Sequence, residues 1–285
     1  MDSFCLIVDK PKDYTSRDVV NVISKKFKTK KVGHTGTLDP IATGVLVVCI
    51  NKATKIAELL TSLDKEYIAE FTFGILTDTL DTEGNIIKEE QAIISKEIVE
   101  KTLKEMIGTY EQEVPIYSAV KVNGKKLYEY ARNGEEVTLP KHKVNIKELE
   151  LLDIKYQNDK TIIKVRCLVS KGTYIRSLGY DLAKKLDTIA IMSDLRRTKQ
   201  GKFNIKDAYT LEDILNDKYD KLNISECLEY PKIEITDNIH KQVLNGAIID
   251  NVYNEETVLF TLNNKEIAIY KTNENKTKLK PWKML

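Results

Sequence analysis

Apolar residues recur along the chain with two periods, one typical of strands and one typical of helices. Apolar or β-rich segments predict strands at 4–8, 45–50, 67–73, 144–156, 161–169, 257–262 and 266–270. Apolar positions three and four residues apart predict helices from Thr15 or Ser16 to Phe27, over 52–63, from Ser95 to Ile107 and over 175–186, with a short helix after Thr210. The chain therefore alternates between both element types.

Two segments interrupt this pattern. Residues 111–143 interleave tyrosines, charges and glycines, and we expect them to form either a long functional excursion or a mobile loop. Pro231 marks a boundary, and a length of 285 residues suggests about two domains. We therefore expect a large domain at 1–230 and a small one at 231–285.

Composition narrows the classes of protein. The net charge is only +2, but bases cluster at 25–31, 196–206 and 276–283, as expected for contact with a nucleic-acid backbone or for a solvated lysine-rich surface. No apolar run reaches the roughly 20 residues that span a membrane, and the first residues lack a basic signal, so we expect a cytoplasmic protein. The four cysteines and three histidines are widely spaced, so no metal site is expected.

The segment Gly33–Gly44 holds the first candidate for chemistry. Three glycines in twelve residues give the backbone unusual freedom, and Pro40 favours an extended conformation for Asp39. The loop lacks the pattern of a P-loop or of a dinucleotide-binding turn. Asp39 is thus a candidate nucleophile or base, and the alternative is an ordinary turn in which it caps a neighbouring amide.

A second candidate lies where a predicted strand meets a helix, at Ser170–Arg176. The guanidinium of Arg176 could pair with Asp39 and keep it ionised. The rings of Tyr67 and Tyr174 could sandwich a planar base. These residues are too far apart in the chain for the sequence alone to bring them together.

Several motifs, taken in order, resemble the TruB-type tRNA pseudouridine synthases. They span residues 9 to about 201 and are Asp9-Lys10-Pro11, Gly33 to Gly44, Lys65-Glu66-Tyr67, Pro115 to Lys121, Ala131 to Gly134, Ser170 to Arg176 and Leu195-Arg196-Arg197. The resemblance implies isomerisation of a uridine in the T-loop of tRNA (position 55) to pseudouridine, without cofactor or metal. It also implies that the nucleotide is flipped out of the folded loop.

The resemblance assigns roles to individual residues. Asp39 would be catalytic, Arg176 would pair with it, and Tyr67 would stack on the base and accept a proton. The other substrate-contacting positions would be His34, Tyr174 and Leu195, and the candidates for contacts with the RNA backbone are Lys10, Lys171, Arg196 and Arg197. The glycines of the loop would leave room for an RNA backbone beside Asp39.

The implied fold is α+β, with a mixed, largely antiparallel sheet and a small β-rich, PUA-like RNA-binding domain at 231–285. Residues 111–143 resemble a mobile RNA-gripping element. We expect a monomer that binds the T-arm of tRNA and needs neither a membrane nor an obligate protein partner. The alternatives are a guide-RNA-dependent rRNA pseudouridine synthase of the same fold, a non-catalytic tRNA-binding or tRNA-folding protein, and a phosphate-cradling metabolic enzyme.

Overall fold

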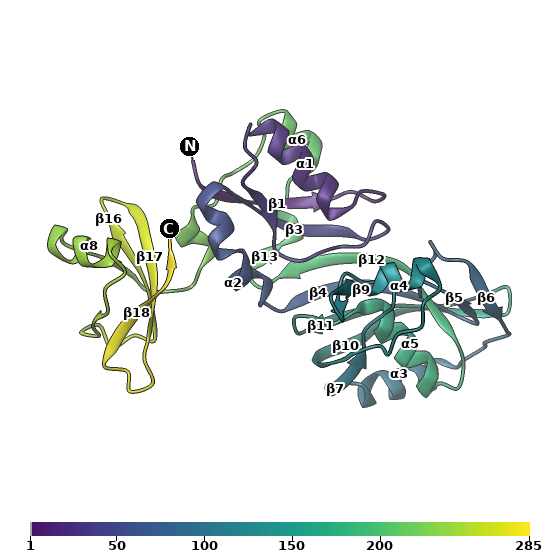
Figure 1. Cartoon of the computed structure of the whole chain (residues 1–285). Helices are drawn as coiled ribbons and strands as arrows, with labels where there is room; N and C mark the ends of the chain where they lie inside the picture. The colour runs from purple at the N-terminus through teal and green to yellow at the C-terminus, as the bar shows by residue number, and fades with distance from the viewer. Residues whose placement is uncertain (1) are drawn as a thin grey trace.

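The computed structural model describes residues 2–285, and its largest element is a nine-stranded mixed sheet (Figure 1). The order is β1-β3-β12-β4-β11-β10-β7, with β2 beside β3 and β13 beside β12; β3 and β12 run parallel, and the other neighbours run antiparallel. The prediction of a mixed, largely antiparallel sheet is confirmed. The strands are β1 (Phe4–Lys10), β2 (Val32–His34), β3 (Thr43–Ile50), β4 (Lys65–Phe73), β7 (Gly108–Glu113), β10 (Lys141–Gln157), β11 (Lys160–Val169), β12 (Ala190–Gln200) and β13 (Phe203–Asn204).

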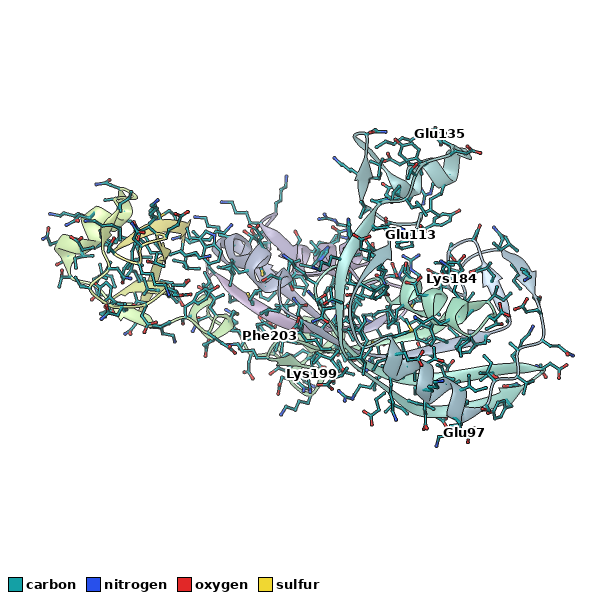
Figure 2. The ribbon with its side chains drawn as sticks, turned by 90° about the horizontal axis from the view of Figure 1, so that it is seen from below. Glu97, Glu113, Glu135, Lys184, Lys199 and Phe203 are labelled. Carbon is teal, nitrogen blue, oxygen red and sulfur yellow. The ribbon has the colours of Figure 1, made fainter. Side chains whose placement is uncertain are left out.

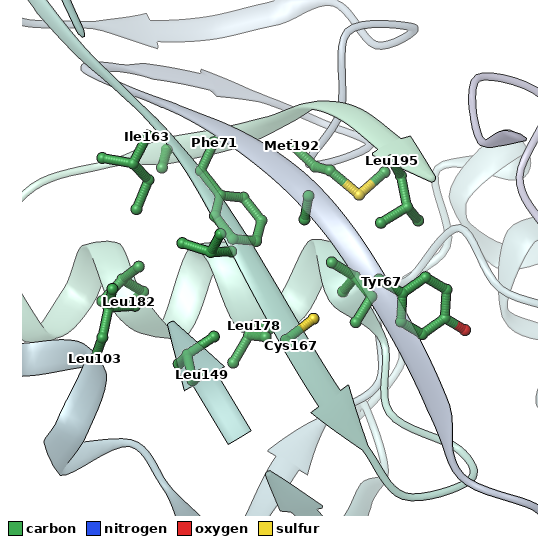
Figure 3. Close-up of a cluster of buried hydrophobic side chains, with 14 of the residues drawn as sticks. Tyr67, Phe71, Leu103, Leu149, Ile163, Cys167, Leu178, Leu182, Met192 and Leu195 are labelled. Carbon is green, nitrogen blue, oxygen red and sulfur yellow. The ribbon is translucent and has the colours of Figure 1, made fainter. Parts of the chain in front are cut away.

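Helices cover this sheet in two separate groups. The helices are α1 (Ser16–Lys26), α2 (Ala57–Thr61), α3 (Lys96–Glu105), α4 (Leu127–Asn133), α5 (Ile175–Lys185), α6 (Leu211–Leu215), α7 (Ile224–Cys227) and α8 (Asp237–Leu244), with 3-10 helices at Asn51–Ile56 and Ile205–Asp207. Helices α3 and α5 pack on β4, β11 and β10, where Leu178 and Leu182 meet Phe71 in one buried cluster (Figure 3). Helices α1 and α6 cover β1 and β3 around a different cluster.

The predicted helix starts follow from capping residues. The side chain of Thr15 accepts a hydrogen bond from the amide of Asp18, whose carboxylate accepts one from the amide of Thr15, so α1 begins at a capping box. Ser95 caps α3 in the simpler way. Both helix predictions are confirmed, whereas the predicted helix over 52–63 is mainly a 3-10 helix followed by the short α2.

The excursion between β7 and β10 contains secondary structure of its own. It holds a hairpin of β8 (Lys121–Val122) and β9 (Lys125–Lys126), followed by α4. Figure 2 shows Glu135 at its outer end and Glu113 near its base, so the excursion projects from the body of the domain. Its two ends are strands of the central sheet, which shortens the irregular segment that the sequence predicted.

A second sheet follows Pro231 and forms a separate lobe at one end of the molecule (Figure 1). Its order is β14-β16-β17-β18-β15, which confirms the strands predicted near 257–262 and 266–270. The strands are β14 (Lys232–Glu234), β15 (Ile249–Asp250), β16 (Thr257–Leu262), β17 (Lys265–Thr272) and β18 (Lys278–Met284), and β5 (Ile75–Thr77) pairs with β6 (Ile86–Glu89) elsewhere. Within residues 2–285, none of the helices has the length and apolar character that a bilayer crossing needs.

Candidate active site

A cavity of about 350 Å³ opens where the Gly33–Gly44 loop, the excursion and the start of α5 meet. Its walls come from five parts of the chain that the sequence alone could not bring together. The residues that line it are Gly36–Asp39, Thr61, Lys65, Tyr67, Tyr117–Ala119, Tyr128, Ser170, Gly172–Arg176, Leu195 and Arg197. Six of the predicted site residues therefore share one cavity: Asp39, Tyr67, Tyr174, Arg176, Leu195 and Arg197.

Asp39 and Arg176 form a two-pronged ion pair in this cavity. The Nε of Arg176 lies 3.0 Å from Oδ2 of Asp39, and its Nη2 donates to Oδ1 at 3.2 Å. This geometry fixes the plane of the carboxylate as well as pairing its charge. The side chain of Arg176 is 6% exposed and that of Asp39 is 33% exposed, so the cation is buried while the carboxylate still faces the cavity.

A second carboxylate, that of Asp81, also pairs with the guanidinium of Arg176, and the sequence analysis did not single it out. Oδ2 of Asp81 lies 3.7 Å from the Nε of Arg176, and Asp81 is buried. Its Oδ1 accepts hydrogen bonds from the hydroxyl of Thr79 at 2.6 Å and from the amide of Glu83 at 3.0 Å. The segment around it, Thr77 to Gly84, is rich in Thr and Asp, and nothing local in such a sequence distinguishes a buried aspartate from a turn residue.

The loop around Asp39 is held by the last residue of β1 and the first residue of α1. The hydroxyl of Ser16 accepts from the amide of Leu38 at 2.9 Å, and Nζ of Lys10 donates to the carbonyls of Pro40 at 3.2 Å and Pro11 at 2.8 Å. Lys10 is fully buried, and burial lowers its pKa to about 8. The prediction that Lys10 contacts an RNA backbone is therefore wrong, since its ammonium group is enclosed by backbone carbonyls.

Tyr67 and Arg197 are paired across the neighbouring strands β4 and β12. The hydroxyl oxygen of Tyr67 accepts hydrogen bonds from Nε of Arg197 at 3.2 Å and from Nη2 at 3.1 Å. Arg197 is 2% exposed and also donates to carbonyls of the Asp39 loop. The prediction that Arg197 contacts an RNA backbone is wrong for this reason.

The remaining predicted residues differ in their surroundings. Tyr174 lines the cavity, and the side-chain amide of Gln112 accepts from its N–H at 2.8 Å and donates to its carbonyl at 3.1 Å. Burial raises the pKa of Tyr174. Leu195 is buried and contributes an apolar part of the wall. Lys171 is exposed, and the side chain of Arg196 is 39% exposed although it pairs with Asp9 at 2.7 Å. Both therefore remain candidates for RNA contact.

His34 lies beside the Asp39 loop, not in the cavity wall. Its Nδ1 accepts a hydrogen bond from the amide of Gly36 at 3.3 Å. Burial lowers the pKa of His34, and the positive charges of Arg17 and Arg197 add to the effect. The imidazole ring is therefore neutral at pH 7, and it holds the loop as a hydrogen-bond acceptor.

Replacing His34 with glutamine should reduce the loss of stability in mild acid. Because the pKa is lowered in the folded state, the unfolded chain takes up this proton first as pH falls through about 6.5, and the folded state loses stability. His34→Gln keeps an acceptor for Gly36 but does not titrate. Urea unfolding at pH 7.5 and pH 5.5 should show a smaller change in the free energy of unfolding for this variant than for the wild type; an equal change would refute the assignment.

Gly44 shows why the loop needs a glycine at its end. Its φ is +101°, and a Cβ atom built there would lie 2.2 Å from the carbonyl oxygen of Arg197. The close neighbour of Gly44 is thus strand β12, and the expectation that this glycine leaves room for RNA is wrong. Among residues 2–285, no three His, Cys, Asp or Glu side chains converge in a way that could hold a metal ion.

The fold matches solved structures over nearly the whole chain. A crystal structure of a Cbf5-Nop10-Gar1 complex aligns with a TM-score of 0.73 and 25% identity, covering 99% of this chain and 84% of the other. An H/ACA ribonucleoprotein bound to a substrate RNA containing 2′-deoxyuridine aligns with a TM-score of 0.72 and 23% identity, covering 99% and 84%. The sheet, with its cavity at the Asp39 loop, is the fold of the pseudouridine synthases.

Sequence comparison identifies the family within this class. Residues 24–175 match the TruB family pseudouridylate synthase N-terminal domain, and residues 176–229 match the tRNA pseudouridylate synthase B C-terminal domain. The tRNA pseudouridine synthase B of Caldanaerobacter subterraneus is 46% identical over 90% of both chains, and that of Bacillus cytotoxicus is 40% identical over 98% of this chain and 96% of its own. The chain belongs to the TruB family of pseudouridine synthases, which are isomerases.

Proposed function

We propose that this protein converts a uridine in the T-loop of tRNA, at position 55, to pseudouridine, and that Asp39 is the catalytic carboxylate. The observation that carries the proposal is the Asp39–Arg176 pair, in which a buried cation holds a partly exposed carboxylate against the cavity. The relatives named tRNA pseudouridine synthase B, 40–46% identical to this chain, support tRNA as the substrate.

The reaction asks three things of the cavity. The target base must leave its stack, at a cost of a few kcal/mol. The glycosidic bond must break beside an ionised carboxylate, which is the role proposed for Asp39. The detached uracil must then turn and rejoin through carbon without escaping, and Tyr67, Tyr174 and Leu195 offer it two rings and an apolar wall. Because uridine and pseudouridine are isomers, no co-substrate has to be supplied.

Surfaces around the cavity are proposed to hold the rest of the RNA. Lys171 and Arg196 would contact phosphates, and the excursion at 111–143 would close over the T-arm. We further propose that 1–230 is the catalytic domain and that the sheet at 231–285 is a PUA-like RNA-binding domain. Contacts of this kind release counterions, so binding should weaken steeply as salt rises.

Two other functions remain as outcomes of a test. The first is a guide-RNA-dependent enzyme of the same fold. The solved H/ACA and Cbf5 complexes that share the fold are only 22–25% identical to this chain. A tRNA-binding protein without catalysis would not require a partly exposed carboxylate held by a buried arginine. The sequence relatives therefore favour the tRNA-modifying enzyme.

The decisive assay uses an isolated T-arm hairpin that carries the target uridine. The purified protein alone should convert this uridine to pseudouridine, measured as tritium released from C5 of labelled uracil. A matched hairpin with cytidine at the target position serves as the control and should release no label. If conversion occurs only in the presence of a guide RNA and partner proteins, the guide-dependent alternative is correct; if the hairpin binds but is never converted, the protein is a non-catalytic binder.

A further inference from the structure

Arg197 is a buried cation for which the described part of the chain provides no carboxylate partner. It is 2% exposed, and none of the ion pairs within residues 2–285 includes it. Its donors instead meet the carbonyls of Gly36, Thr37 and Val45 and the hydroxyl of Tyr67. A buried charge without a counter-ion is costly. Neutral carbonyls satisfy its N–H groups, but they do not cancel its charge.

Among the acceptors of Arg197, the Tyr67 oxygen is the one that belongs to a side chain lining the cavity. Two N–H groups of Arg197 donate to that one oxygen, at 3.2 and 3.1 Å, and the centre of the guanidinium lies 5.3 Å from the centroid of the ring. Both Tyr67 and Arg197 line the cavity that holds Asp39. Hydrogen bonds from a cation stabilise negative charge on an acceptor oxygen more strongly than neutral donors do.

We propose that Arg197 is a positioning residue that stabilises the Tyr67 oxygen as a proton acceptor in the last step of the reaction. This inference rests on the proposed function. When C5 of uracil has joined the sugar, C5 still carries its hydrogen. That proton passes to the side-chain oxygen of Tyr67 as the hydroxyl gives its own proton to solvent, the C–H electron pair restores the C5=C6 double bond, and the C6=N1 π pair moves to N1, which takes a proton from water.

Other titratable groups surround Tyr67, and their contributions to the pH profile have to be distinguished from that of Tyr67. They are Lys65 on the same strand, Cys167 opposite on β11, Asp39 and His34 in and beside the loop, and Tyr174 and Arg176 at the start of α5. Lys65 matters most, because burial, helped by the charge of Arg197, lowers its pKa to about 8. A Lys65→Arg background stays charged across the working pH range and removes this complication.

The test is a double-mutant cycle read as a pH profile. Single-turnover conversion of the T-arm hairpin is measured from pH 6 to 10 for the wild type, Arg197→Lys, Tyr67→Phe and the double variant. Arg197→Lys should slow conversion about 10- to 100-fold at pH 7, because one of the two charge-assisted bonds is lost, and should move the rising limb to higher pH. In the Tyr67→Phe background the same substitution should cost no more than about twofold.

The outcomes separate this inference from the proposed function. If the wild type does not convert the hairpin at all, the proposed function fails. If the wild type converts it but Arg197→Lys costs the same with Tyr or Phe at position 67, Arg197 only holds the loop and the inference is overturned. The inference is also overturned if the increase of the conversion rate with pH disappears in Lys65→Arg.

Folding of the variants is checked in two ways. Tyr67→Phe removes one oxygen and leaves Arg197 in place, so it tests the inference even if Arg197→Lys fails to fold; an unchanged rate and pH profile in this variant would refute it. Arg166→Lys is the matched control, because it makes the same substitution at a partly exposed arginine of β11 that pairs with surface glutamates and lines no part of the cavity. Its hairpin conversion should keep the wild-type pH profile.

Discussion

Replacing Asp39 with asparagine is expected to lower single-turnover conversion of the T-arm hairpin about a thousandfold or more. Asparagine has nearly the same shape but cannot attack or accept a proton as a carboxylate does. The loop should keep its position, because Ser16 and Lys10 hold it through backbone atoms of Leu38 and Pro40. Arg176 retains Asp81 as a partner, so the substitution does not leave a buried cation unpaired.

Binding should separate from turnover in this variant. The Kd for the hairpin, measured by filter binding, should stay within about threefold of the wild type, since the surface bases proposed to hold the phosphates are unchanged. Asp64→Asn is the control, because Asp64 pairs with Lys147 on the surface and lines no part of the cavity. Retention of more than about a tenth of the wild-type rate by Asp39→Asn would show that another group performs the chemistry.

Replacing Gly44 with alanine is expected to destabilise the protein by more than about 3 kcal/mol. The new Cβ would meet the carbonyl oxygen of Arg197 at 2.2 Å and its nitrogen at 2.9 Å, and these are backbone atoms of a central strand that cannot move aside. The positive φ of +101° adds backbone strain of its own. The free energy of unfolding, measured in urea, tests this expectation.

Gly172→Ala separates the two contributions. Gly172 also has a positive φ, +80°, but a Cβ atom built there has nothing within 4 Å. The loss in the free energy of unfolding of Gly172→Ala should therefore reflect backbone strain alone, about 1–2 kcal/mol. If both variants lose the same stability, the contact between Gly44 and β12 has no energetic weight.

The sequence predicted most of what depends on local order. The capping box at Thr15 and the alternation of β4 and β11 lie within a few residues, so periodicity reveals them. The pairing of Asp39 with Arg176 was expected from the two Gly-containing corners and from the family resemblance. The structure places these two side chains within hydrogen-bonding distance, although 137 positions separate them.

Other features were not predicted, because polar residues are buried or a helix buries almost no apolar residue. Strand β12 was not predicted, since its inward positions Arg197 and Gln200 are polar and break the apolar alternation. Helix α8 was missed because Val243 is its one buried residue in the described structure. The family resemblance made Lys10 a candidate for RNA contact without regard to burial, whereas its ammonium group is enclosed by backbone carbonyls. Asp81 reaches Arg176 only through the fold.

The contact at Gly44 lies on a line that divides the sheet. Strands β3 and β12 are joined in parallel by two residue pairs, at Thr43–Gly44 and Arg196–Arg197, whereas β1 and β3 share seven. The strands on the two sides of this line are covered by different buried clusters. The Asp39 loop leads into β3 on one side, but its residues Leu38 and Ile41 pack in the cluster of the other side, which contains Tyr67. A change deep in either cluster can therefore misalign the chemistry without touching any atom that faces the substrate, so selection for activity also acts on the packing of both halves.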